Sequence, residues 1–164
     1  MKIRILASVC YVLFAIGAFA DSYTITLSAN QCSLIANQLD APGGNTIGNL
    51  LAPPAITDGT ILFKYSGGFS AYTYSTDDGQ WDPDPSVTLN PGEGAIITSP
   101  VATTITFTGT PHVPVLPVTL SGCTLRLLSG QTTNAPATFQ DVTGLSPTNG
   151  YTLYRHNPGQ PCSS

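Results

Sequence analysis

Two segments of the chain alternate threonine with apolar residues, and this alternation limits the possible folds more than any other feature. They are residues 23–27 (YTITL) and 104–108 (TITFT). A period of two places apolar side chains on one face of a strand and polar ones on the other, which is typical of a sheet with one buried and one solvated face. The composition agrees, because two Lys and one Glu among 164 residues leave little material for amphipathic helices.

The rest of the chain adds further strand candidates, which are residues 69–75, 86–89 and 95–98. Residues 46–51 (TIGNLL) are expected to form one helical turn. The fold class predicted from these patterns is all-β, an antiparallel β-sandwich with little helix.

The first twenty residues have the pattern of a secretory signal peptide. A basic start at residues 1–4 precedes an uncharged apolar stretch over residues 5–20, and Ala18 and Ala20 supply the small residues that precede a cleavage site. The stretch is shorter than the roughly 20 residues that span a bilayer. We therefore expect a secreted or cell-surface protein with no membrane segment after cleavage.

The expected mature chain, residues 21–164, is acidic and of a size that suits a single domain. Its only basic residues are Lys64, Arg126 and Arg155, against nine acids, which gives a net charge of −6. A protein that binds nucleic acid needs clustered cations to displace counterions from phosphates. Nucleic acid is therefore not expected as a partner.

Parts of the sequence recur at a constant spacing. Residues 32–34 (CSL) recur as 123–125 (CTL), and residues 62–64 (LFK) recur as 153–155 (LYR), both at an offset of 91. Such self-similarity indicates an internal duplication.

The duplication divides the mature chain unequally. It predicts a complete repeat unit at 21–110, a proline-rich connector at 111–117 and a truncated second unit at 118–164. A shortened second unit would leave a strand edge with unpaired backbone groups, and pairing with another subunit would satisfy them.

The first unit also carries a set of turn and core motifs. They are residues 32–35 (CSLI), Asp58-Gly59 before residues 62–65 (LFKY), Trp81, and residues 91–94 (PGEG). The pattern resembles a family of secreted bacterial all-β repeat domains with a GWNLI-like strand, an Asp-Gly turn before an IYKY-like strand, and a PGEGFF-like turn. The resemblance implies a β-rich module on a secreted or surface protein.

Three cysteines remain after signal cleavage, Cys32, Cys123 and Cys162. An odd number in an oxidising compartment implies one intramolecular bridge with a leftover thiol, or an intermolecular bond. Cys32 and Cys123 occupy equivalent places in the two units, which favours a bridge between them and leaves Cys162 for a bond between subunits. A bridge between Cys123 and Cys162 is the alternative.

Candidate binding residues are few. Tyr72 and Tyr74 fall on one strand face, and with Trp81 they are a possible aromatic platform for glycans, although cross-strand packing is the commoner role of such a trio. The acidic loop 77–84 is interpreted as a turn, because it lacks the spaced acids of a calcium loop. No catalytic residue, metal ligand or cofactor motif is assigned.

The function expected from these observations is structural. We predict a secreted, non-enzymatic protein that self-assembles by β-strand complementation, as in an extracellular fibre, with other copies of itself as partners. The alternative is a carbohydrate-binding or adhesive surface module that uses the aromatic platform.

Overall fold

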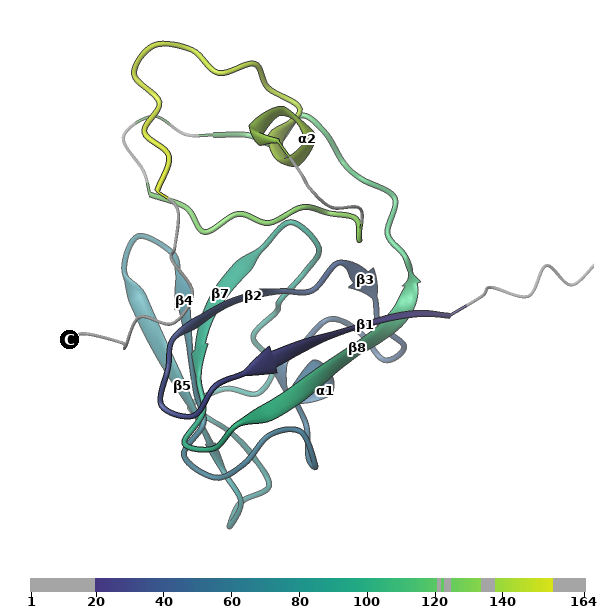
Figure 1. The fold of residues 1–164 in the computed structure, drawn as a ribbon, viewed down its shortest axis with the longest axis vertical. Coiled ribbons are helices and arrows are strands. Elements are labelled where there is room, and N and C mark those ends of the chain that lie inside the picture. The colour runs from purple at the N-terminus through teal and green to yellow at the C-terminus, as the bar shows by residue number, and fades with distance from the viewer. Residues whose placement is uncertain (1–19, 121, 123–124, 134–137, 155–164) are drawn as a thin grey trace, which may run out of the picture.

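The computed structural model describes residues 20–120, 122, 125–133 and 138–154. The chain forms eight strands and two short helices in that part, and the strands, all before residue 112, make up two antiparallel sheets (Figure 1). The elements are β1 Asp21–Leu27, β2 Ser33–Ala36, β3 Leu39–Asp40, α1 Ile47–Leu50, β4 Ile61–Tyr65, β5 Phe69–Ser75, β6 Gln80–Asp82, β7 Gly94–Thr98, β8 Thr103–Pro111 and α2 Phe139–Thr143.

The smaller sheet has the strand order β1-β8-β3. Its two long strands are the segments whose alternation predicted strands, and Tyr23 is in register with Phe107 while Thr24 is in register with Thr106. Phe107 is buried and both threonines are exposed. The alternation therefore corresponds to one face against the core and one in solvent, as expected.

The larger sheet has the order β2-β7-β4-β5-β6. It contains the predicted strands at 62–65, 69–75 and 95–98, and α1 matches the helical turn expected at 46–51. Two sheets with little helix confirm the predicted all-β sandwich.

The strand predicted at 86–89 is wrong, because this segment belongs to neither sheet and forms only the isolated bridge between Thr46 and Thr88. Its backbone is bonded instead to the chain around the start of α1. The Ile47 N–H donates to the Val87 carbonyl at 2.8 Å, and the Leu89 N–H donates to the Asn45 carbonyl at 2.7 Å. The segment thus covers one side of the sandwich together with α1.

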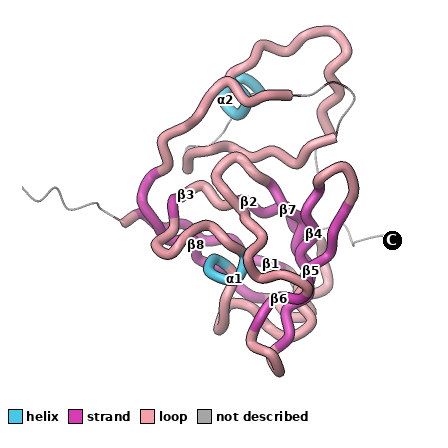
Figure 2. Tube along the Cα trace, turned by 180° about the vertical axis from the view of Figure 1, so that it is seen from behind, coloured by secondary structure: helices cyan, strands magenta, loops and turns pink. Residues whose placement is uncertain are grey.

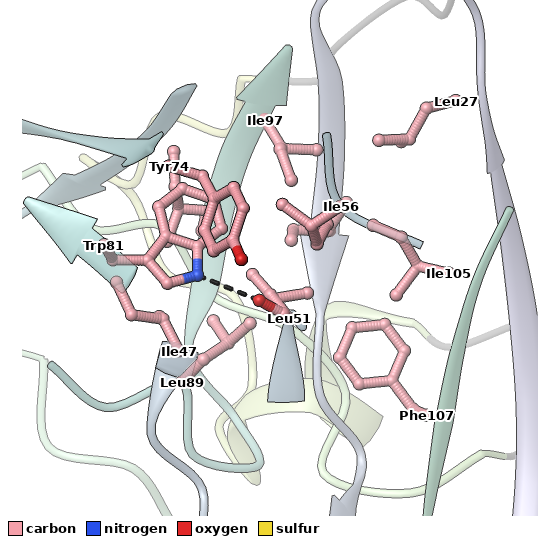
Figure 3. Packing of buried hydrophobic residues seen from close by; sticks show 13 residues of the cluster. Leu27, Ile47, Leu51, Ile56, Tyr74, Trp81, Leu89, Ile97, Ile105 and Phe107 are labelled. Atoms are coloured by element: carbon pink, nitrogen blue, oxygen red, sulfur yellow. Dashed lines mark hydrogen bonds between the residues drawn. The ribbon is translucent and has the colours of Figure 1, made fainter. Parts of the chain in front are cut away.

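The core lies between the two sheets, and Figure 3 shows how side chains from both of them meet. Phe107 from β8 faces a cluster that includes Trp81 from β6 and Leu62 from β4, and none of the three is more than 1% exposed. The burial and close packing of apolar side chains such as these is the main contribution to the stability of a folded domain.

The part of the chain beyond β8 does not form a second set of strands among its described residues. Apart from α2 it is loop (Figure 2), and its one β-type pairing is the isolated bridge between Glu93 and Leu128. Leu153 and Tyr154, which the repeat aligns with Leu62 and Phe63 of β4, are 77% and 78% exposed and lie in no strand. The described residues therefore do not confirm a repeat.

This part is nevertheless tied to the sandwich. Within this part, the buried Gln131 side chain bonds both backbone groups of Val115, accepting from its N–H at 2.7 Å and donating to its carbonyl at 3.1 Å, and the tie to the sandwich comes from the chain around Leu127. The Gly94 N–H donates to the Leu127 carbonyl at 3.1 Å. The predicted connector 111–117 thus begins at Pro111, the last residue of β8, and continues as an irregular segment, as Pro114 and Pro117 favour.

Candidate functional site at the open edge of β1

A sandwich of two open sheets has four edge strands, and an edge that is left unprotected is where another chain can pair. The strands at the ends of the two sheets are β3 with 2 residues, β6 with 3, β2 with 4 and β1 with 7. In the described structure β3 pairs with β8 only at Thr110 and Pro111, so over residues 103–109 β8 has a strand neighbour on the β1 side alone. The four edges differ in how they are protected, and that difference identifies the candidate site.

The β6 and β3 edges are short and their ends are blocked. Pro83 follows β6 directly and offers no N–H to a further strand. At β3, Asp40 carries a carboxylate whose Oδ1 lies 2.9 Å from Nδ1 of His112. Neither edge offers enough backbone for a stable added strand.

The β2 edge is partly closed by a side chain from β1. The Tyr23 hydroxyl donates to the Ala36 carbonyl at 2.6 Å and accepts from the Gln38 N–H at 3.0 Å. Burial raises the pKa of Tyr23 from 10.0 to about 12, partly offset by the hydrogen bond from Gln38. The hydroxyl therefore stays protonated at ordinary pH and keeps both bonds.

The β1 edge is the longest, and it lacks the usual protection. Its sequence, DSYTITL, contains no Lys, Arg, Pro or Gly, and its one charge, Asp21, stands at the end. Within the described chain β1 pairs with β8 alone, over all seven residues. A long, regular edge rich in β-branched residues is a template for strand addition.

Tyr23 also holds β1 in place from the inside. Its ring stacks on Phe107 with centroids 5.1 Å apart and planes 16° apart, and its hydroxyl reaches the end of β2. Figure 1 shows β1 running along the outside of the fold beside β8. β1 is thus already held in place as a strand, so less conformational entropy is lost when another strand pairs with it.

The structure places two of the three aromatic residues of the predicted glycan platform, Tyr74 and Trp81, in the interior, and Tyr72 is half-buried. Trp81 is 1% and Tyr74 3% exposed, their rings pack edge to face with centroids 5.6 Å apart, and Trp81 Nε1 donates to the Leu51 carbonyl at 2.9 Å (Figure 3). Tyr72 packs against the same core. Tyr74 and Trp81 therefore have the packing role and are closed to a sugar, and without them Tyr72 alone does not form the predicted platform.

A hollow of ≈ 420 Å³ lies next to this cluster, between the α1 region and β6. Its walls include Pro53, Gln80 and Pro85. Among the described residues that line it there is no Asp, Glu, His, Lys or Cys.

The acidic loop contains internal bonds that are typical of a turn. Asp84 accepts hydrogen bonds from the Ser86 hydroxyl and N–H, and these lower the pKa of its carboxyl. In the described part of the chain, no three His, Cys, Asp or Glu side chains gather as metal ligands.

Cys32 is disulfide-bonded. Cys123 and Cys162 lie outside the described residues, so the expected pairing of Cys32 with Cys123 and the intermolecular role of Cys162 stay predictions. The predicted signal peptide also lies outside them, except for Ala20. No helix among the described residues is long and apolar enough to cross a membrane.

Comparison with protein-family models, with curated proteins and with solved structures finds no match to this chain. The fold and the β1 edge therefore carry the functional argument by themselves.

The sequence patterns identify neither β1 as the open edge nor Tyr23 as the residue that partly closes the β2 edge. The predicted repeat placed the open edge in the second unit, where the described residues form no strand. Residues 23–27 were recognised as a strand, but the alternation that reveals a strand is the same at the edge and in the middle of a sheet. Tyr23 was read as an apolar position of that strand, and only the fold brings its hydroxyl to Ala36.

Proposed function

We propose that this chain is a secreted, non-enzymatic structural protein that self-associates by β-strand addition, with β1 as the receiving edge. The observation that carries the proposal is the seven-residue β1 edge, uncharged after Asp21 and paired on one side only in the described structure. In an antiparallel strand alternate residues direct their backbone groups to opposite sides, so roughly three or four residues of β1 offer an N–H and a C=O outward.

The chemistry of β1 supports self-association over recognition of a charged partner. Ser22, Thr24 and Thr26 form its exposed face, and that face carries no charge of either sign. Backbone hydrogen bonds supply the affinity in strand addition, and side-chain fit supplies the specificity. Every copy of the chain presents this same uncharged face and edge, which suits assembly of identical copies into an extracellular fibre.

The test is the mass and shape of residues 21–164 over a range of protein concentration, by light scattering after size exclusion and by negative-stain microscopy. Wild-type protein is expected to form oligomers or filaments. The edge variant Thr24→Lys with Thr26→Lys places two cations on β1, and we expect it to raise the concentration needed for assembly more than about tenfold.

The matched control is Thr104→Lys with Thr106→Lys. These threonines are the register partners of Thr26 and Thr24 on β8, and they are exposed on the same face of the sheet. The control adds the same charge to the same face but on the partner strand β8 instead of on the β1 edge, so it should assemble like the wild type. A wild-type protein that remains monomeric at millimolar concentration would refute the proposal.

A further inference from the structure

A fibre built on β1 needs a second segment on the same molecule. If β1 of one copy pairs with β1 of another, the contact is symmetric and closes as a dimer. An open chain of subunits requires a different surface of the molecule, the donor, to occupy β1. The inference below rests on the proposed function and names that donor.

Three described segments outside the two sheets expose large apolar side chains, and each is a candidate donor. They are residues 113–116, 125–128 and 151–154. Covering an exposed apolar side chain removes it from water, so these side chains are where contact with a partner would be most favourable in free energy. The segments differ in whether their backbones are free to pair.

The first two segments are already engaged. In 113–116, Pro114 has no N–H, and both backbone groups of Val115 are bonded to the Gln131 side chain. In 125–128, the Leu127 carbonyl accepts from Gly94 and Leu128 is bridged to Glu93. Neither can join a sheet of another copy without breaking contacts of its own fold.

Residues 151–154 (YTLY) are different. The Tyr151 N–H donates to the Thr148 carbonyl at 3.3 Å and its ring lies against Phe139 of α2 with centroids 5.7 Å apart, so Tyr151 is partly engaged. The three residues after it take part in none of the hydrogen bonds of the described structure. Leu153 is 77% and Tyr154 78% exposed. Tyr, Thr and Leu in this order suit an added strand, because aromatic and β-branched residues pack well on a pleated surface.

The position of this segment points to pairing between copies. Figure 1 shows the end of the described chain, in yellow, on the side of the fold where β4 and β7 lie and well apart from β1. The segment carries no charge and β1 carries only Asp21, so bringing the two together buries no unpaired cation.

We propose that residues 151–154 of one copy add as a strand to the β1 edge of the next copy. The contact is head-to-tail, because donor and receiver are different surfaces of the same chain. Repetition of one head-to-tail contact yields a filament, or a ring where the rotation closes. At one end of such a filament the β1 edge stays open, and at the other end the 151–154 segment stays unpaired.

The donor is tested with Leu153→Lys. Its matched control is Val113→Lys, because Val113 is 80% exposed in a segment that the structure excludes as a donor. We expect Leu153→Lys to be monomeric where the wild type assembles, and Val113→Lys to assemble like the wild type. Circular dichroism melts of both variants should match the wild type, since neither side chain is buried, and Tyr154→Lys provides a second donor variant at a similar exposure.

A mixing experiment separates the two surfaces. The Thr24→Lys, Thr26→Lys protein keeps an intact donor, and Leu153→Lys keeps an intact β1. Each alone should be monomeric, and an equimolar mixture should form a 1:1 dimer that grows no further. The masses are measured by light scattering on the folded mature chains.

The outcomes distinguish the donor from the proposed function. If Leu153→Lys and Tyr154→Lys assemble like the wild type while the β1 variant does not, the donor is overturned and strand addition at β1 stands. If Leu153→Lys forms dimers by itself, β1 pairs with β1 and the head-to-tail contact is overturned. A wild type that never assembles overturns both.

Discussion

Replacing Tyr23 by Phe removes one oxygen atom and should destabilise the fold measurably. The hydroxyl makes two hydrogen bonds at the end of β2 and just after it, to the Ala36 carbonyl at 2.6 Å and from the Gln38 N–H at 3.0 Å. The ring would keep its stacking on Phe107, where the centroids are 5.1 Å apart. The variant therefore isolates the hydrogen bonds from the packing.

The magnitude follows from those two bonds. Each contributes about 1 kcal/mol net to stability, and a partly buried carbonyl or N–H left without a partner costs a further fraction of its desolvation energy. Because water reaches part of this site, we expect the free energy of unfolding to fall by about 1–3 kcal/mol. For a domain of this length the melting temperature would drop roughly 2–4 °C per kcal/mol.

The assay is urea unfolding of residues 21–164, with Tyr72→Phe as the matched control. Tyr72 is also half-buried against the core, but its hydroxyl makes no hydrogen bond in the described structure. The slope of the free energy against urea should not change, since the exposed area on unfolding is the same. If the two variants agree to within about 0.5 kcal/mol, Tyr23 does not fasten β1 to the end of β2 and our account of that edge is wrong.

Two further predictions concern pH and the core. The pKa of Tyr23 is raised to about 12 in the fold against 10.0 when unfolded, so its contribution is complete below pH 10 and is lost progressively as the pH rises toward 12. The stability difference between the wild type and Tyr23→Phe, measured by urea unfolding from pH 8 upward, should shrink over that interval, and a constant difference would contradict it. Trp81→Phe removes the bond from Nε1 to the Leu51 carbonyl and leaves a void at a residue that is 1% exposed, so calorimetry should show a loss of about 2–4 kcal/mol. An unchanged melting temperature would mean that Trp81 is not packed as the structure shows.

Most of the strands could be predicted from the sequence, because their signals are local. The alternation in 23–27 and 104–108 corresponds in the fold to the inward and the exposed faces of β1 and β8. The segment 86–89 failed as a strand prediction, since its backbone bonds go to the chain at the start of α1. Composition cannot distinguish a segment that joins a sheet from one that pairs with a loop.

The glycan platform failed for a related reason. The spacing of Tyr72 and Tyr74 correctly places them on one strand face, and the sequence leaves open whether that face is the inner or the outer one. The fold turns it inward, where Trp81 from the next strand completes the packing. The same three residues on the outer face would have been a surface patch.

The amino-acid sequence by itself determined the strand-forming segments, the scarcity of helix and charge, and the all-β class, because these depend on residue type and on a period of two along the chain. Only the tertiary structure decided which strand lies at an edge. That property depends on how many neighbours a strand finds across distant parts of the chain, and β1 finds only β8, 76 residues or more away at every paired position. The longest unprotected edge is therefore a result of pairing between distant segments, which no local pattern in residues 21–27 records.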